Sequence, residues 1–170
     1  MSNPSRDNPL AFLEPFGDTA QPEQLAELLG AQAPFKDLSW GELNTLARYM
    51  QGYRVAPGKV LFHEGDAGDF LCVILEGRVR IVKRDSHNKE KEIGAHGTGK
   101  TLGEMAMVDG ERRSATCTAA ELTTIAILSR ARFEALTKEF PGLAVAVLVR
   151  LARILSQRLR LTSGQLVDYL

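Results

Sequence analysis

The residues best suited to bind a charged ligand lie together in the stretch LGEMAMVDGERRSAT, which begins at residue 102. Gly103 allows a close backbone approach at the start of a short helix, whose free N–H groups favour an anion. A carboxylate only accepts hydrogen bonds, so Glu104 can accept a hydrogen bond from the 2′-hydroxyl of a ribose. Arg113 can hold a phosphate through a forked contact, and the next two residues can complete the cradle with N–H groups and a hydroxyl: Ser114 and Ala115. This chemistry suits a small cyclic phosphate on a sugar.

A second glycine-rich motif directly precedes the first. Residues 94–101 read GAHGTGKT and fit the pattern GxxxxGK[ST] of a phosphate loop. Such a loop needs a buried strand before it and a full helix after it. The preceding residues NKEKEI contain one large apolar side chain, and Asp109-Gly110 stops the following helix after two turns. ATP binding through Lys100 and Thr101 is therefore disfavoured, and we keep it only as an alternative.

The composition is that of one ordinary globular domain. The chain has 170 residues, 21 Lys and Arg against 21 Asp and Glu, and 44% hydrophobic residues. Zero net charge disfavours a generic nucleic-acid binder. Cys72 and Cys117 lie in apolar runs without CxxC spacing, and residues 1–8 lack a signal-peptide core. The longest apolar run, Leu143–Val149, is far shorter than the roughly 20 residues that span a bilayer. We expect a soluble cytoplasmic protein.

The N-terminal part is predicted to be an arm with one short helix. Prolines at positions 4, 9, 15, 22 and 34 interrupt an acidic segment. Within it, Gln21–Leu29 has leucines at helical spacing. We place the arm at residues 1–32 and the main domain at 33–170. Ser39-Trp40-Gly41-Glu42 is a capping box that predicts a helix ending near Met50.

The middle of the chain has the pattern of a β-structure. Between Gly52 and Ser129, short apolar runs alternate with glycine turns. The predicted strands can form a small barrel or a jelly-roll-like body. They are Tyr53–Ala56, Lys59–His63, Phe70–Leu75, Val79–Lys83, Lys91–Ala95, Arg113–Ala119 and Thr123–Leu128.

Two helices are predicted to close the chain. The first begins after Ser129 as N-cap and continues through Phe140, and the second runs from Leu143 to about Leu161 after a break at Pro141-Gly142. In the second, apolar residues recur at helical spacing: Val147, Leu151, Ile154 and Leu161. Arginines occupy the polar side: Arg150, Arg153, Arg158 and Arg160. This helix either packs on its own barrel or forms a dimer seam; Arg158 would interrupt a strict seam.

The stretch from Gly103 to Ala115 resembles the phosphate-binding cassette of the cyclic nucleotide-binding domain family. That cassette has a Gly-Glu pair, a small apolar helix, and an Arg followed by Ser, Thr or Ala and then Ala. Other segments are similar to the family in order and spacing: FKDLS at 35–39, APG at 56–58, HEGDAGD at 63–69 and VILEGRV at 73–79. The resemblance covers about residues 33–160.

The resemblance implies a mainly β fold: an antiparallel, jelly-roll-like β-roll with N-terminal helices and C-terminal hinge and lid helices. It implies that cAMP or cGMP is the ligand. The implied ribose and phosphate contacts are Gly103, Glu104, Arg113, Ser114 and Ala115, with Ile81, Ile93 and Gly94 near the base and sugar. The Arg-Ser-Ala order favours Arg113 over Arg112. Lys100 follows Gly99 where the family has a Gly-Asp pair, which adds a cation beside the cassette.

We expect a stand-alone cyclic nucleotide sensor that signals through a protein partner or a homodimer formed by the C-terminal helix. We expect no enzyme, no cofactor and no metal, since His63, His87 and His96 form no ligand pattern. Only Thr162–Leu170 would follow the last helix, too few residues for a helix-turn-helix, so DNA binding is not expected. Membrane binding is not expected because the longest apolar run is short. The alternative is an interaction module that does not use the ligand, in which Glu104 and Arg113 form only a structural ion pair.

Overall fold

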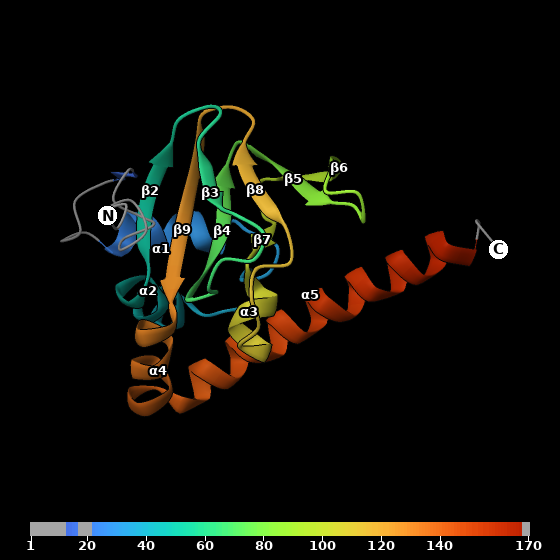
Figure 1. Cartoon of the computed structure of the whole chain (residues 1–170). Coiled ribbons are helices and arrows are strands. Elements are labelled where there is room, and N and C mark those ends of the chain that lie inside the picture. The colour runs from blue at the N-terminus through green and yellow to red at the C-terminus, as the bar shows by residue number, and fades with distance from the viewer. Residues whose placement is uncertain (1–12, 17–21, 168–170) are drawn as a thin grey trace, which may run out of the picture.

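Two antiparallel sheets form the body of the molecule in the computed structural model, which describes residues 13–16 and 22–167 (Figure 1). One sheet has the order β1 (Glu14–Pro15), β2 (Gln51–Val55), β9 (Thr123–Ser129), β4 (Phe70–Glu76) and β7 (Thr101–Leu102). The other has the order β3 (Val60–Phe62), β8 (Thr116–Ala119), β5 (Arg78–Arg84) and β6 (Glu90–Gly97). With the flanking helices, this topology confirms the predicted antiparallel β-roll.

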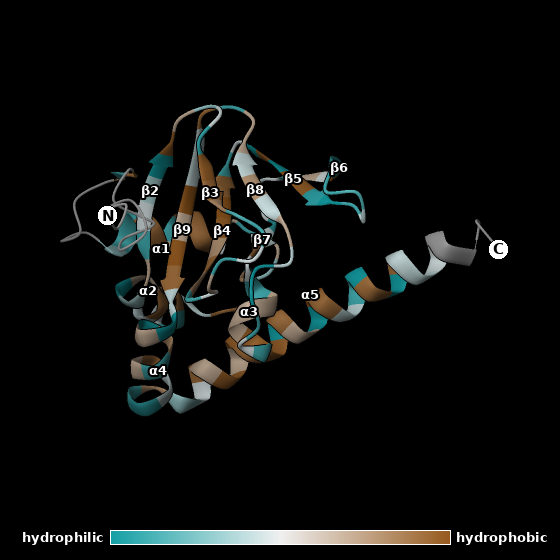
Figure 2. Ribbon diagram, viewed as in Figure 1, coloured by the Kyte–Doolittle hydropathy of each residue, from teal (hydrophilic) through white to brown (hydrophobic). Residues whose placement is uncertain are grey.

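Strand β4 separates two hydrophobic cores. Its sequence FLCVILE is apolar up to the last residue, and successive side chains point to opposite faces of the sheet. Cys72 and Ile74 belong to the cluster inside the roll, and Leu71 and Val73 belong to the cluster beneath the helices. Strand β9 alternates in the same way, and both strands appear as the brown centre of the molecule in Figure 2. The continuous apolar runs therefore reflect burial on both faces.

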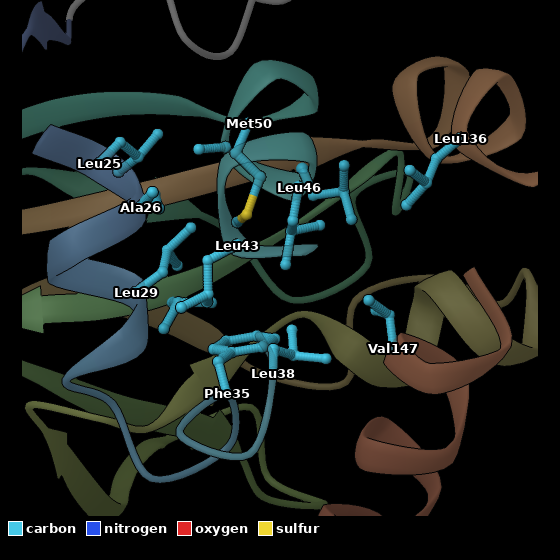
Figure 3. Close-up of a cluster of buried hydrophobic side chains, with 14 of the residues drawn as sticks. Leu25, Ala26, Leu29, Phe35, Leu38, Leu43, Leu46, Met50, Leu136 and Val147 are labelled. Carbon is cyan, nitrogen blue, oxygen red and sulfur yellow. The ribbon is translucent and has the colours of Figure 1, made fainter. Parts of the chain in front are cut away.

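Helices from both ends of the chain cover the outer face of β4 and β9. They are α1 (Pro22–Gly30), α2 (Trp40–Tyr49), α4 (Arg130–Glu139) and α5 (Pro141–Val167). Figure 3 shows how their leucines meet: Leu29 of α1, Leu46 of α2 and Leu136 of α4 belong to one buried cluster with Val147 of α5. The capping box that was predicted at Ser39 is present, with Ser39 and Glu42 bonded reciprocally. The terminal helices thus share one core.

Helix α5, which runs from Pro141 to Val167, is longer at both ends than the predicted helix. It begins at Pro141 rather than Leu143, because proline is tolerated at the first helical position. Val147 and Leu151 are buried in the chain's own core, as expected if the helix packs on its own barrel, whereas Leu161 of the same predicted pattern is exposed. The C-terminal half of α5 extends past the roll (Figure 1). No helix in the described residues is both long and apolar enough to cross a membrane.

The seven predicted strands correspond to β2–β6, β8 and β9, with shifted ends. The prediction that Arg113–Ala115 is extended strand is wrong, because β8 begins at Thr116. The backbone of Arg113 instead joins the turn at Gly65 and Asp66. The short strands β1 and β7 carry no pattern long enough to be recognised in sequence. Of the predicted helix Gln21–Leu29, Gln21 lies outside the described residues and the rest is α1.

The shared helical core predicts a large effect for Leu136→Ala. Leu136 is fully buried, so its truncation should lower the free energy of unfolding by about 2–5 kcal/mol. The matched control is Leu122→Ala, since Leu122 is 60% exposed and should change stability by less than about 0.5 kcal/mol. Urea unfolding measures both. Equal stability of the two variants would contradict the assignment of Leu136 to the core.

Candidate functional site

The short helix α3 (Glu104–Asp109) begins at a glycine that no other residue could replace without strain. Gly103 has a φ of +75°, in the left-handed region. A Cβ at this position would overlap the guanidinium of Arg113 and lie 3.0 Å from the carbonyl oxygen of Phe70. Gly103 therefore lets Arg113 approach the backbone directly beneath α3.

Arg113 is a buried cation without a carboxylate partner in the described structure. Its side chain is 3% exposed, and its guanidinium lies over the rings of Phe62 and Phe70, with 4.2 Å and 4.4 Å between the guanidinium carbon and the ring centroids. Nη1 donates to the carbonyl oxygen of Gly103 at 3.1 Å. Nε and Nη2 have no partner. Burial lowers the pKa of Arg113, yet a guanidinium keeps its proton at neutral pH.

Glu104, the first residue of α3, is 2% exposed and pairs with an arginine from α5. One carboxylate oxygen, Oε1, accepts from Nη1 of Arg158, while Oε2 has no partner. Nη2 of Arg158 donates to the carbonyl oxygen of Thr101 at 2.8 Å. Burial raises the pKa of Glu104, and the charge of Arg158 is the main influence that lowers it. The ion pair of Glu104 is therefore with Arg158 and not with Arg113, so the alternative in which Glu104 and Arg113 form a structural pair is wrong.

The unsatisfied polar atoms of the described residues all belong to this one region. The buried side-chain nitrogen and oxygen atoms without a well-formed hydrogen bond are Oγ1 of Thr101, Oε2 of Glu104, and Nε and Nη2 of Arg113, and the Thr101 hydroxyl is near enough to the Glu104 carboxylate to lower its pKa. Buried polar groups are normally hydrogen-bonded, so such a cluster is unusual. It combines donors on a cation with an acceptor on a carboxylate. This arrangement can bind a ligand that has both an anionic group and hydroxyls.

The remaining predicted site residues are divided between the interior and the surface. Ala115 is buried and Ser114 is exposed, with its hydroxyl directed to the sulfur of Met105. Ile81 is half-buried against the interior of the roll and pairs with Gly94 across β5 and β6. Ile93 is 61% exposed, so it does not line the interior. The register of β5 and β6 shifts here, because Ile81 pairs with Gly94 while Val82 pairs with Glu92. Ile93 is the extra residue between these two pairs, and such a bulge changes the direction in which a side chain points.

The GAHGTGKT segment is not a phosphate loop. Its first residues continue β6, and Thr101 belongs to the two-residue strand β7. The N–H of Gly99 donates to Ile74 and that of Lys100 to Gly97, so neither is available to a phosphate. ATP binding of the phosphate-loop type is therefore excluded, and Lys100 is an exposed residue of a turn.

Neither cysteine nor histidine chemistry is evident in the described residues. Cys72 and Cys117 are buried free thiols, and burial raises the pKa of Cys117 to about 12. Residues 13–16 and 22–167 contain no group of three or more His, Cys, Asp or Glu side chains that could hold a metal.

Sequence reasoning missed Arg158 and Thr101 as parts of the site. The helical spacing predicts only that Arg158 lies on the polar side of α5. Arg158 follows Glu104 by 54 residues in the sequence, so no local pattern joins them. Its only sequence signal is that it interrupts the apolar spacing of the helix. Thr101 was considered as part of the phosphate-loop motif, although its side chain is buried beside Glu104.

Comparisons with known proteins point to one domain type. Residues 53–140 match the family model described as cyclic nucleotide-binding domain. The solved structure of a cyclic nucleotide-binding domain from Methylobacillus flagellatus is 33% identical, covers 96% of both chains and has a TM-score of 0.83. The cyclic AMP receptor protein of Thermus thermophilus is 32% identical over 74% of this chain and 56% of its own length.

A much longer protein also matches. Lysophospholipase nte1 of Neosartorya fischeri is 32% identical over 65% of this chain, but this chain spans only 7% of its length. The similarity is therefore confined to a small part of that protein.

The environment of His96 on β6 predicts a pH dependence of stability. Burial, together with the charges of Arg158 and Lys100, lowers the pKa of His96 below 6.5. Below pH 6.5 the unfolded chain then binds more protons than the folded chain, so stability falls as the pH decreases through this window. In His96→Gln this loss should diminish.

Chemical denaturation of the His96→Gln variant between pH 5 and pH 8 measures the effect. His87→Gln is the matched control, because His87 is exposed in the hairpin between β5 and β6. A His96→Gln profile parallel to that of the wild type would contradict the burial of His96.

Proposed function

Because this chain belongs to the cyclic nucleotide-binding domain family, we propose that it senses cAMP or cGMP and transmits binding through helix α5. The observation that carries the proposal is the cluster of unpartnered buried atoms on Thr101, Glu104 and Arg113. A cyclic nucleotide supplies a phosphate anion and a ribose hydroxyl, which are the partners that these atoms lack. The name of the Thermus thermophilus relative, cyclic AMP receptor protein, agrees with this ligand class.

In the proposed complex, Arg113 binds the cyclic phosphate. Its Nε and Nη2 can form a forked pair of hydrogen bonds to two phosphate oxygens. The rings of Phe62 and Phe70 and the carbonyl oxygen of Gly103 already fix the guanidinium, so little side-chain entropy is lost on binding. The backbone N–H groups at Ser114 and Ala115 complete the cradle.

Glu104 binds the ribose through Oε2, because Oε1 is held by Arg158. An ionised carboxylate accepts hydrogen bonds at both oxygens and is the stronger acceptor for a ribose hydroxyl, but burial opposes the ionisation of Glu104. The positive charge of Arg158 offsets this effect. Arg158 is therefore a positioning residue that keeps Glu104 charged and oriented.

The same arginine connects the ligand site to α5. Arg158 donates hydrogen bonds to Glu104 and to the carbonyl oxygen of Thr101. A ligand that moves the Glu104 carboxylate therefore changes a contact of helix α5. A ligand shifts the position of α5 only to the extent that it binds the two arrangements with different affinity. We place the response in the C-terminal half of α5, which extends beyond the roll (Figure 1).

A homodimer is one way in which α5 can pass on the response. The exposed large apolar side chains of this helix are Val145, Leu148, Val149, Leu159 and Leu161. Val145, Leu148 and Val149 are spaced by three and four residues, and Leu159 lies eleven residues after Leu148, so these four side chains form a stripe on one face of the helix, whereas Leu161 lies on another face. The stripe of Val145, Leu148, Val149 and Leu159 shares no residue with the predicted pattern of Val147, Leu151, Ile154 and Leu161, and it supports a second copy of the chain as the partner.

Calorimetric titration of the protein with cAMP and with cGMP tests the ligand and its site. We expect saturable binding of at least one nucleotide. In Arg113→Leu the affinity should fall by about a hundredfold or more, because the buried phosphate would have no counter-charge. Arg112→Leu is the matched control: Arg112 is adjacent, exposed and bonded only to the carbonyl oxygen of Gly65, so affinity should be retained.

Circular dichroism checks that both variants fold. Wild-type protein that binds neither nucleotide would contradict the sensor function and favour the ligand-independent interaction module. Equal losses in Arg112→Leu and Arg113→Leu would contradict the placement of the phosphate.

Arg158→Gln tests the positioning role. Loss of the charge raises the pKa of Glu104 further, so nucleotide affinity should fall about tenfold and should weaken more steeply as the pH decreases from 8 to 6. Arg160→Gln removes the same charge from the same helix, where the arginine contacts only Ser156, and should bind as the wild type does. Identical pH profiles for the two variants would assign no binding role to Arg158.

A further inference from the structure

A cleft with a cavity of about 300 Å³ lies between α5, the segment at residues 33–37 and the turn at residues 99–101. Its volume is at the lower limit of cavities that bind small molecules. Thr101 and Arg158 contribute to its wall, but the residues of the α3 cassette, from Gly103 to Ala115, do not. The cleft therefore lies beside the site proposed for the cyclic nucleotide and shares Thr101 and Arg158 with it.

The walls of this cleft are strongly cationic. Lys100, Arg150, Arg153 and Arg158 line it, against a single carboxylate from Asp37. The sequence of α5 contains four arginines and no acidic residue, although the whole chain has zero formal net charge. Helix α5 therefore carries four positive charges and no negative charge.

Most of these cations form no close ion pair, although Arg150 lies near enough to Glu42 to lower the pKa of that carboxylate. Within the described part of the chain, ion pairs of 4.0 Å or less include Arg158 but not Lys100, Arg150 or Arg153. Arg150 donates only to the carbonyl oxygen of Ala146, four residues earlier in its own helix. Charges of one sign held on a helix and a facing turn repel each other, and a bound anion would relieve this repulsion.

Part of the remaining wall of the cleft is apolar, beside the polar side chains of Thr101 and Gln157. Ala33 and Pro34 lie on one side, and Ile154 and Leu161 on the α5 side. A ligand that fits has a compact, multiply charged head and a small body with an apolar surface. Guanidinium groups match the oxygens of a phosphate in forked pairs, and a lysine adds a mobile point charge.

We propose that the cleft between Lys100 and the arginines of α5 binds a small molecule that carries a diphosphate or a similar multiply charged phosphate group. Lys100 and Arg153, which face the cleft from opposite sides, hold the charged head, and Arg150 contributes a further donor. This gives the Lys100 turn a role although its backbone is not a phosphate loop. The inference does not depend on cyclic nucleotide binding.

Titration of the intact protein with pyrophosphate, at constant ionic strength and followed by calorimetry, tests the site. We expect saturable binding with a stoichiometry of one, weakened about tenfold or more in the double variant Lys100→Ala/Arg153→Ala. Lys83→Ala/Arg160→Ala is the matched control, because it also removes one lysine and one arginine, but from exposed positions outside the cleft. This variant should retain binding.

Arg113→Leu separates this site from the nucleotide site. Pyrophosphate binding should persist in this variant, and its loss would place the anion at Arg113 and overturn the proposal. Equal weakening in the two double variants, equal binding of citrate and pyrophosphate, or no saturable binding would overturn it as well, since each would leave only general attraction to a positive surface. Thermal unfolding of each variant confirms that it is folded.

Discussion

The buried guanidinium of Arg113 is the constraint on which the rest of the site depends. Each buried donor without a partner costs about 1–3 kcal/mol, and Arg113 has two such nitrogens. The rings of Phe62 and Phe70 and the carbonyl oxygen of Gly103 offset part of this cost. Gly103 must lack a side chain to permit the contact. The protein thus holds a cation ready for an anion rather than neutralising it internally.

The two cores separated by β4 and β9 connect this constraint to the helices. The inner core contains Phe62 and Phe70, which support Arg113, and the outer core joins α5 to α2 and α4. Only one side-chain ion pair among the described residues links α5 to the cassette, that of Arg158 with Glu104. Because Glu104 keeps one free oxygen, the link and a ribose contact can coexist. In the function that we propose, ligand binding and the position of α5 are coupled at this single carboxylate.

The sequence was sufficient for the fold and for the residues that lie close together in the chain. The glycine turns, the apolar runs and the capping box at Ser39 are local patterns, and they predicted most elements. Gly103, Glu104 and Arg113 were recognised because they lie within one short stretch. Arg158 could not be assigned, because its pairing depends on how α5 crosses the cassette. The exposure of Ile93 was equally hidden, because a register shift in β5–β6 changes which side chains face inward.

The resonance of the Arg113 side-chain Nε–H tests the central claim most directly. In a ¹H–¹⁵N spectrum recorded during titration with cAMP or cGMP, this signal, assigned by its absence in Arg113→Lys, should move to higher proton frequency as it gains a phosphate acceptor. The corresponding signal of exposed Arg112 should stay in place. Saturation with nucleotide that leaves the Arg113 signal unmoved would contradict the account, because the buried donors would then not be the ligand's partners.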